Sequence, residues 1–208
     1  MDWFTLAPGP YDGRMNPPPL PLVVFGFVAL CVLILVLSVR ERRALSAWRE
    51  WAQSAGFTVD DSWLPSRPQL MVSGERGGNP FQVEFWGGRS NVTVVRVLVP
   101  GLPEGLGVCR KRWVLPFRTL RPRIVSTGDA WADETCSVMA ADEETARAFF
   151  SRPETVRVLR RLFIQERDCV LERGALFLLR PGIARVDEID QLLQRLEPAA
   201  RGLLSRAA

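Results

Sequence analysis

Three carboxylates lie close together in residues 126–135, STGDAWADET. They are Asp129, Asp133 and Glu134. Hard divalent cations prefer oxygen ligands, and Mg²⁺ often needs only one or two carboxylates together with water or phosphate. A metal held here would bridge the oxygens of a phosphoester and lower the pKa of the attacking water. One hypothesis is therefore a metal-assisted phosphoester hydrolase that uses these three side chains.

The same segment also has a structural interpretation. Gly128 followed by Asp129 is a common turn pair, in which the aspartate side chain accepts hydrogen bonds from nearby backbone amides. No EF-hand or P-loop spacing surrounds the carboxylates. We favour a turn or a helix cap for this segment and keep the metal site as the alternative.

A second polar cluster is the basic run in residues 110–123. Arg110, Lys111 and Arg112 are consecutive, and further arginines follow with Trp113 and Phe117 between them. Such a mixture could contact anionic lipid headgroups or an acidic protein. Cations that alternate with apolar residues are also typical of a strand with one solvated face, and we favour this interpretation. The candidates for lipid or partner contact are Arg40, Arg42, Arg43, Arg110, Lys111 and Arg112.

Several kinds of chemistry are excluded by composition. The chain of 208 residues has no histidine, which removes Ser-His-Asp and Cys-His catalysis and the HExxH metallopeptidases. Its four cysteines form no CxxC pair, so neither a zinc site nor a thioredoxin-type motif is indicated. The net charge of +4 comes from arginines without any known nucleic-acid-binding motif. We expect no cofactor and no nucleic acid partner.

An apolar segment positions everything that follows. Residues 20–39 contain no charge, and about 20 helical residues span the roughly 30 Å of bilayer hydrocarbon. A cleaved secretory signal would need a basic start and a shorter apolar core. We therefore predict an uncleaved transmembrane helix.

Its orientation follows from the flanking arginines. Arg40, Arg42 and Arg43 follow the segment, whereas Arg14 alone precedes it. Short flanks rich in Lys and Arg stay in the cytoplasm. The sequence thus predicts a short Pro-rich extracytoplasmic leader (1–19), a transmembrane helix (20–39) and a cytoplasmic domain (40–208). We expect a single-pass protein of the bacterial inner membrane.

The cytoplasmic part is predicted to be α+β, with a largely antiparallel sheet packed against three to four helices. Residues 69–74, 81–86 and 92–99 read as a meander, 106–115 and 135–140 as further strands, and 169–181 as a hairpin around Arg173 and Gly174. Asp142 begins one helix, and Ser151 with Glu154 fits a capping box that begins the next. Pro198 should kink or break the last helix.

Taken together, these features predict a membrane-anchored protein with a non-enzymatic cytoplasmic interaction domain. The expected partners are membrane lipid and either another protein or a second copy of the chain. The alternatives are the metal-assisted hydrolase at Asp129, Asp133 and Glu134, and a domain that binds anionic lipid through its basic run.

Overall fold

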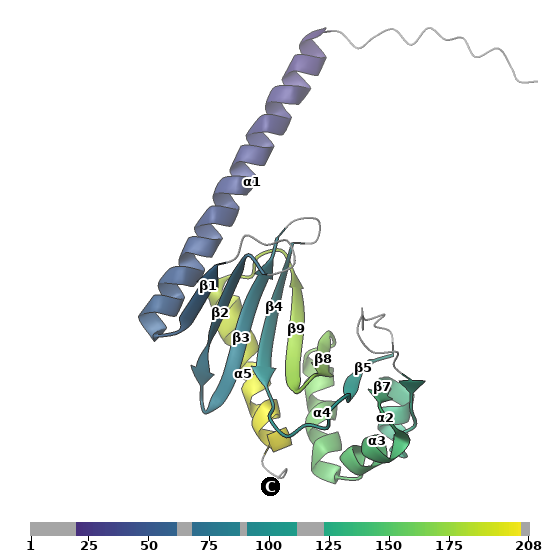
Figure 1. The fold of residues 1–208 in the computed structure, drawn as a ribbon. Helices are drawn as coiled ribbons and strands as arrows, with labels where there is room; N and C mark the ends of the chain where they lie inside the picture. The colour runs from purple at the N-terminus through teal and green to yellow at the C-terminus, as the bar shows by residue number, and fades with distance from the viewer. Residues whose placement is uncertain (1–19, 62–67, 88–90, 112–122, 205–208) are drawn as a thin grey trace, which may run out of the picture. The chain divides into compact units, whose positions relative to one another are not determined.

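The computed structural model describes residues 20–61, 68–87, 91–111 and 123–204. They fall into two compact units, divided between Arg40 and Glu41, and each unit is described by itself (Figure 1).

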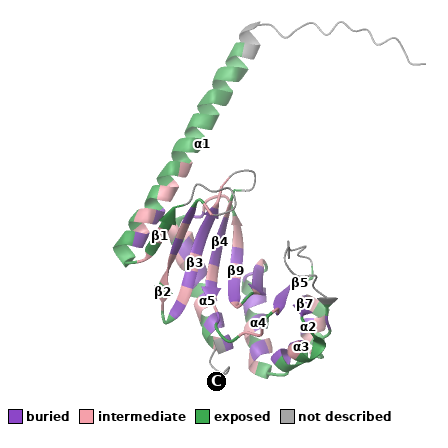
Figure 2. Cartoon of the chain, in the orientation of Figure 1, coloured by how far each residue is buried: buried purple, intermediate pink, exposed green. Residues whose placement is uncertain are grey.

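The first unit is formed by the N-terminal part of helix α1, Leu20–Ala55. This helix is long and apolar enough to cross a membrane, and none of its most apolar window is buried inside the protein. Its large side chains are exposed, for example Phe25 to 74%. A core helix of a soluble protein would instead be covered by the rest of the chain. The exposed apolar surface, shown green in Figure 2, is what a helix that contacts lipid requires.

The second unit is built on a sheet that has nine strands within the described residues, in the order β1-β2-β3-β4-β9-β8-β5-β7-β6. Each pair of neighbouring strands is antiparallel. The strands are β1 (Thr58–Asp61), β2 (Leu70–Arg76), β3 (Asn79–Trp86), β4 (Val92–Leu98), β5 (Gly107–Arg110), β6 (Arg123–Ile124), β7 (Cys136–Ala140), β8 (Cys169–Glu172) and β9 (Ala175–Pro181). The C-terminal hairpin β8–β9 therefore joins the β1–β4 meander to the strands β5, β7 and β6.

Four further helices complete this unit: α2 (Ala130–Thr135), α3 (Glu143–Phe150), α4 (Pro153–Gln165) and α5 (Val186–Leu204). Helix α5 packs on β3, β4 and β9, α4 packs on α5, and α2 and α3 pack on β7. The result is an α+β fold with a largely antiparallel sheet, which confirms the fold class predicted from the sequence.

The core lies between the sheet and the helices that pack on it. Alternate residues of β3, Phe81, Val83 and Phe85, are buried, as period-two patterning requires. The end of α1 belongs to the same core, because Trp48 is fully buried and its indole N–H donates to the carbonyl of Ala184 at 2.9 Å. Phe57, just after α1, packs edge-on against Phe81 with ring centroids 4.9 Å apart.

Most local predictions for the second unit are confirmed. The meander appears as β2, β3 and β4, and the hairpin turns at Arg173 and Gly174, both with positive φ. Asp142 caps α3 by accepting a hydrogen bond from the amide of Thr145. The predicted strand 106–115 appears as β5, and its residues 112–115 lie outside the described part of the chain.

Three local predictions are corrected or refined by the structure. Ser151 ends α3 instead of capping the next helix, which begins with Pro153 at its first position, where a missing N–H costs nothing. The segment favoured as a turn or a helix cap continues into helix α2, which contains Asp133 and Glu134. Pro198 does not break the last helix, since α5 continues through it to Leu204 while packed against the sheet and α4; the predicted kink stays a prediction.

Candidate functional site

The acidic segment forms a short helix with its own cap. Asp129 is the N-cap of α2, and its carboxylate accepts a hydrogen bond from the amide of Ala132 at 2.8 Å. This is the geometry in which a side chain satisfies one of the unpaired N–H groups of a helix start. The carboxylate of Asp129 is thus used by the fold, as the structural interpretation of the sequence expects.

Asp133 is held by the loop that precedes α2. Its two carboxylate oxygens accept hydrogen bonds from the Ser126 hydroxyl, the amide and hydroxyl of Thr127, each at 2.8 Å, and the amide of Gly128 at 3.2 Å. Partial burial raises the pKa of Asp133, but these hydrogen bonds outweigh it and bring the pKa below its usual value. The carboxylate is therefore ionised and fully occupied.

Glu134 is exposed on α2. Within the ranges that the structure describes, no group of three histidine, cysteine, aspartate or glutamate side chains could hold a metal ion. The metal site at Asp129, Asp133 and Glu134 stays a prediction. Calorimetry with Mg²⁺ or Mn²⁺, compared with the Asp129→Asn, Asp133→Asn double variant, is its test.

The basic candidates are spread over two elements. Arg40, Arg42 and Arg43 are exposed on α1. Arg110 ends β5, and the next residue, Lys111, donates both its amide to the carbonyl of Thr135 and its ammonium group to the carbonyl of Asp133. Arg112 lies outside the described residues.

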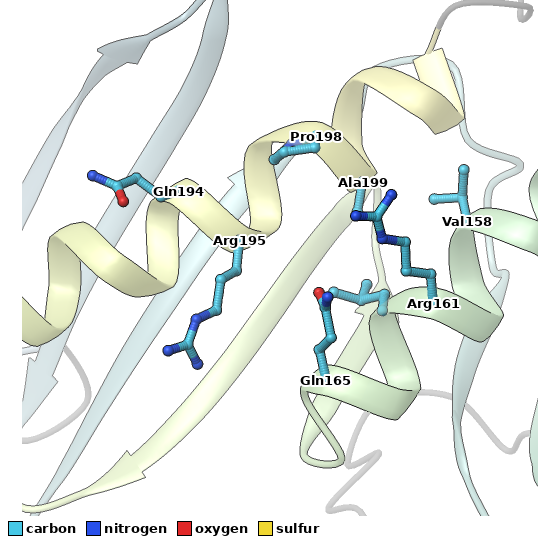
Figure 3. Close-up of a pocket in the computed structure, with 8 residues that line it drawn as sticks. Val158, Arg161, Gln165, Gln194, Arg195, Pro198 and Ala199 are labelled. Atoms are coloured by element: carbon cyan, nitrogen blue, oxygen red, sulfur yellow. The ribbon is translucent and has the colours of Figure 1, made fainter.

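A site that the sequence did not indicate lies between the last two helices. One face of α4 and one face of α5 enclose a groove of about 290 Å³ (Figure 3). We call it the α4–α5 groove; it is lined by Val158, Arg161, Leu162 and Gln165 from α4 and by Gln194, Arg195, Pro198 and Ala199 from α5. On each helix these residues recur at spacings of three and four, which places them on one face.

The groove combines an apolar surface with positive charge. Val158, Leu162, Pro198 and Ala199 are its apolar lining, and its two charged lining residues, Arg161 and Arg195, are both cations. No lining residue is an acid, a base near neutral pH or a nucleophile, so the groove is suited to binding and not to proton transfer.

One buried carboxylate orients this region. Glu166, directly after α4, is 4% exposed and accepts hydrogen bonds from Arg180 of β9 at 2.8 Å and from Arg195 of α5. A buried charge is tolerated when it is paired and hydrogen-bonded, and removing one partner is costly. Glu166 therefore joins the end of α4 to both α5 and the sheet and fixes the position of Arg195.

The sequence carried a partial signal for this groove. A proline inside a helical pattern is unusual, and Pro198 lies in the groove. The pairing of α4 with α5 is a long-range contact, however, and no local pattern shows which helix lies beside which.

Comparison with known proteins gives one informative result. No protein-family model matches this sequence, and no curated protein matches it. Among solved structures, the chain is similar to the crystal structure of the mycobacterial trehalose monomycolate transport factor A, TtfA, with a TM-score of 0.53 and 15% sequence identity. The match covers 80% of this chain and 96% of that chain. At this identity the likeness shows the shared fold.

Proposed function

We propose that this chain is a single-pass protein of the bacterial inner membrane whose cytoplasmic domain is a non-enzymatic interaction module. The observation that carries the proposal is the different burial of the two ends of α1. Its N-terminal part has an exposed apolar surface, and its C-terminal part contributes the fully buried Trp48 to the core of the sheet domain. Helix α1 thus contains both the apolar segment that we propose as the anchor and a residue of the domain core.

The arginines support the direction of insertion. Arg40, Arg42 and Arg43 follow the apolar segment and are exposed, as expected for a flank that stays on the cytoplasmic side and meets anionic headgroups. Lipid contact here contributes to retention at the membrane, whereas recognition of other molecules belongs to the folded domain.

The fold likeness to a transport factor supports an auxiliary role of the same general kind. The α4–α5 groove offers a surface with binding character and without catalytic groups, which is compatible with such a role. We therefore propose that the domain contributes to a membrane-associated assembly, either with another protein or with a second copy of itself.

The test combines extraction and co-purification. The full-length chain, carrying an affinity tag after Ala208, should stay in the membrane pellet after alkaline carbonate treatment and require detergent for release. Purified in mild detergent, it should elute as an assembly larger than one chain or carry a stoichiometric partner. Release by carbonate would contradict the anchor, and a lone monomer in repeated purifications would contradict the interaction role.

A further inference from the structure

The lining of the α4–α5 groove indicates the chemistry of a partner that would bind there. This inference rests on the proposed interaction role. Of the groove's apolar lining residues, Pro198 on α5 is exposed and Val158 on α4 is half-buried. Leu162 and Ala199 are buried and form the base of the groove. A space of about 290 Å³ is below the usual size of a pocket for a drug-sized molecule and is open between two helices. It fits one or two apolar side chains of a larger partner.

The charged side chains around this lining are arginines, and not all of them are paired with a carboxylate. Helix α4 carries Arg157, Arg160 and Arg161 against a single acid, Glu154. Arg157 pairs with Glu154 at 2.7 Å, and Arg160 lies over the ring of Trp131 at 5.9 Å from its centroid. Among the described residues Arg161 has no ion-pair or hydrogen-bonding partner, and it lines the groove.

The acids of α5 do not neutralise this surface, because they are engaged elsewhere. Asp190 and Glu197 both pair with Arg76 of β2, at 2.5 and 3.1 Å, on the side of α5 that meets the sheet. Glu188 lies 3.7 Å from Arg180. Glu166 is buried and satisfied by two arginines. The side of α5 that faces α4 therefore adds no carboxylate to the groove, and its one charged lining residue, Arg195, is paired with Glu166. Within the described part of the chain, the unpaired positive charge of the groove is that of Arg161.

Pro198 adds a feature that suits a polypeptide. Because proline has no backbone N–H, the carbonyl of Gln194, four residues earlier, lacks its usual donor within the helix. Gln165 and Gln194 also line the groove, and each has a side-chain amide with two N–H donors and an acceptor. A bound peptide supplies both backbone N–H groups and carbonyls for these positions, whereas an alkyl chain supplies neither.

We propose that the α4–α5 groove binds an acidic segment of a partner protein, which packs an apolar side chain against Val158 and Pro198 and places a carboxylate against Arg161. An arginine that pairs with a carboxylate forms a charge-assisted, bidentate hydrogen bond. Its contribution increases when the neighbouring apolar side chain excludes water from the pair. Positive charge on the groove also favours an acidic partner over a basic one during encounter.

The test uses the full-length chain in lipid nanodiscs and a defined probe. The probe is a short, fluorescein-labelled amphipathic peptide with leucines on one face and glutamates on the flanks; a matched peptide has lysine in place of every glutamate. We expect the acidic peptide to bind, measured by fluorescence polarisation, and the basic peptide to bind at least about tenfold more weakly. Binding should weaken as salt is raised.

Two variants locate the binding. Arg161→Glu should lower the affinity for the acidic peptide at least about tenfold. Gln165→Trp, which places a bulky side chain at an exposed lining position four residues after Arg161, should lower it to a similar extent. Arg167→Glu makes the same charge change at an exposed position outside the groove and should leave the affinity within about twofold.

Three results would overturn the proposal. The first is that neither peptide binds, and the second is that Arg161→Glu and Arg167→Glu change the affinity for the acidic peptide equally. The third is displacement of the acidic peptide by submicellar dodecanoate, which would assign the groove to a small amphiphile. These outcomes are separable from the proposed function. If Arg161→Glu still co-purifies with its partner and stays in the membrane, the interaction role holds and another surface of the domain supplies the contact.

Discussion

Replacing Trp48 tests whether the end of α1 is a structural part of the domain. The side chain is fully buried, and truncation of a buried tryptophan to alanine typically costs about 3–5 kcal/mol. The indole N–H is also the donor to the carbonyl of Ala184, which is itself buried, and leaving such an acceptor without a partner costs about 1–3 kcal/mol. Since a domain of this size is stable by about 5–15 kcal/mol, Trp48→Ala should lose a large fraction of its stability.

Trp48→Phe separates the two contributions, because it keeps most of the apolar volume and loses the hydrogen bond. It should cost roughly 1–3 kcal/mol. Glu50→Ala changes an exposed residue of the same helix and should stay within about 0.5 kcal/mol of the wild type.

Pulse proteolysis in urea, applied to the full-length chain in mild detergent, measures the folded fraction without relying on tryptophan fluorescence. If Trp48→Ala unfolds at the same urea concentration as Glu50→Ala, the end of α1 is a tether and not part of the core, and our description of the anchor is wrong.

Other positions give further predictions. Asp133→Asn should lower the free energy of unfolding at neutral pH by about 1 kcal/mol, because the carboxylate accepts several hydrogen bonds. The pKa of Asp133 is lowered in the folded protein, so this contribution is present above the ordinary carboxyl pKa of about 4 and is lost as the pH falls below it. Urea unfolding measured at decreasing pH should therefore show the stabilities of the two proteins converging. Glu166→Gln should destabilise the protein by about 3 kcal/mol in the same assay, because it leaves two arginines without their shared buried anion. Burial raises the pKa of Cys109 to about 11 and that of Cys136 to about 12. In a background without Cys31 and Cys169 (Cys31→Ser, Cys169→Ser), both thiols should therefore react with Ellman's reagent at mildly alkaline pH only after unfolding. Rapid modification of the folded protein would contradict their burial.

Local patterns predicted much of this fold. Alternation of Phe81, Val83 and Phe85 with polar residues marks β3, and Gly174 with Arg173 marks the hairpin because both adopt positive φ there. Asp142 was recognisable as a helix cap from its position before two glutamates. In each case the signal and its structural effect lie within a few residues of each other.

What the sequence did not show depends on contacts between distant segments. Strands β1 and β6 are short, and each is defined by pairing with a neighbour instead of by its own apolar pattern. The insertion of the β8–β9 hairpin beside β4 has no local cause. The α4–α5 groove exists because Arg161 and Pro198, far apart in sequence, lie on facing helices, and neither residue predicts the other.

The membrane arrangement is tested most directly by labelling single cysteines in whole cells. In a chain whose native cysteines are replaced by serine, one variant carries Thr5→Cys in the leader and another carries Glu144→Cys at an exposed position of the sheet domain. With a membrane-impermeant maleimide, we predict that intact cells label the Thr5→Cys protein and that the Glu144→Cys protein reacts only after lysis. Labelling of the Glu144→Cys protein in intact cells, or recovery of either protein in the soluble fraction, would contradict the account.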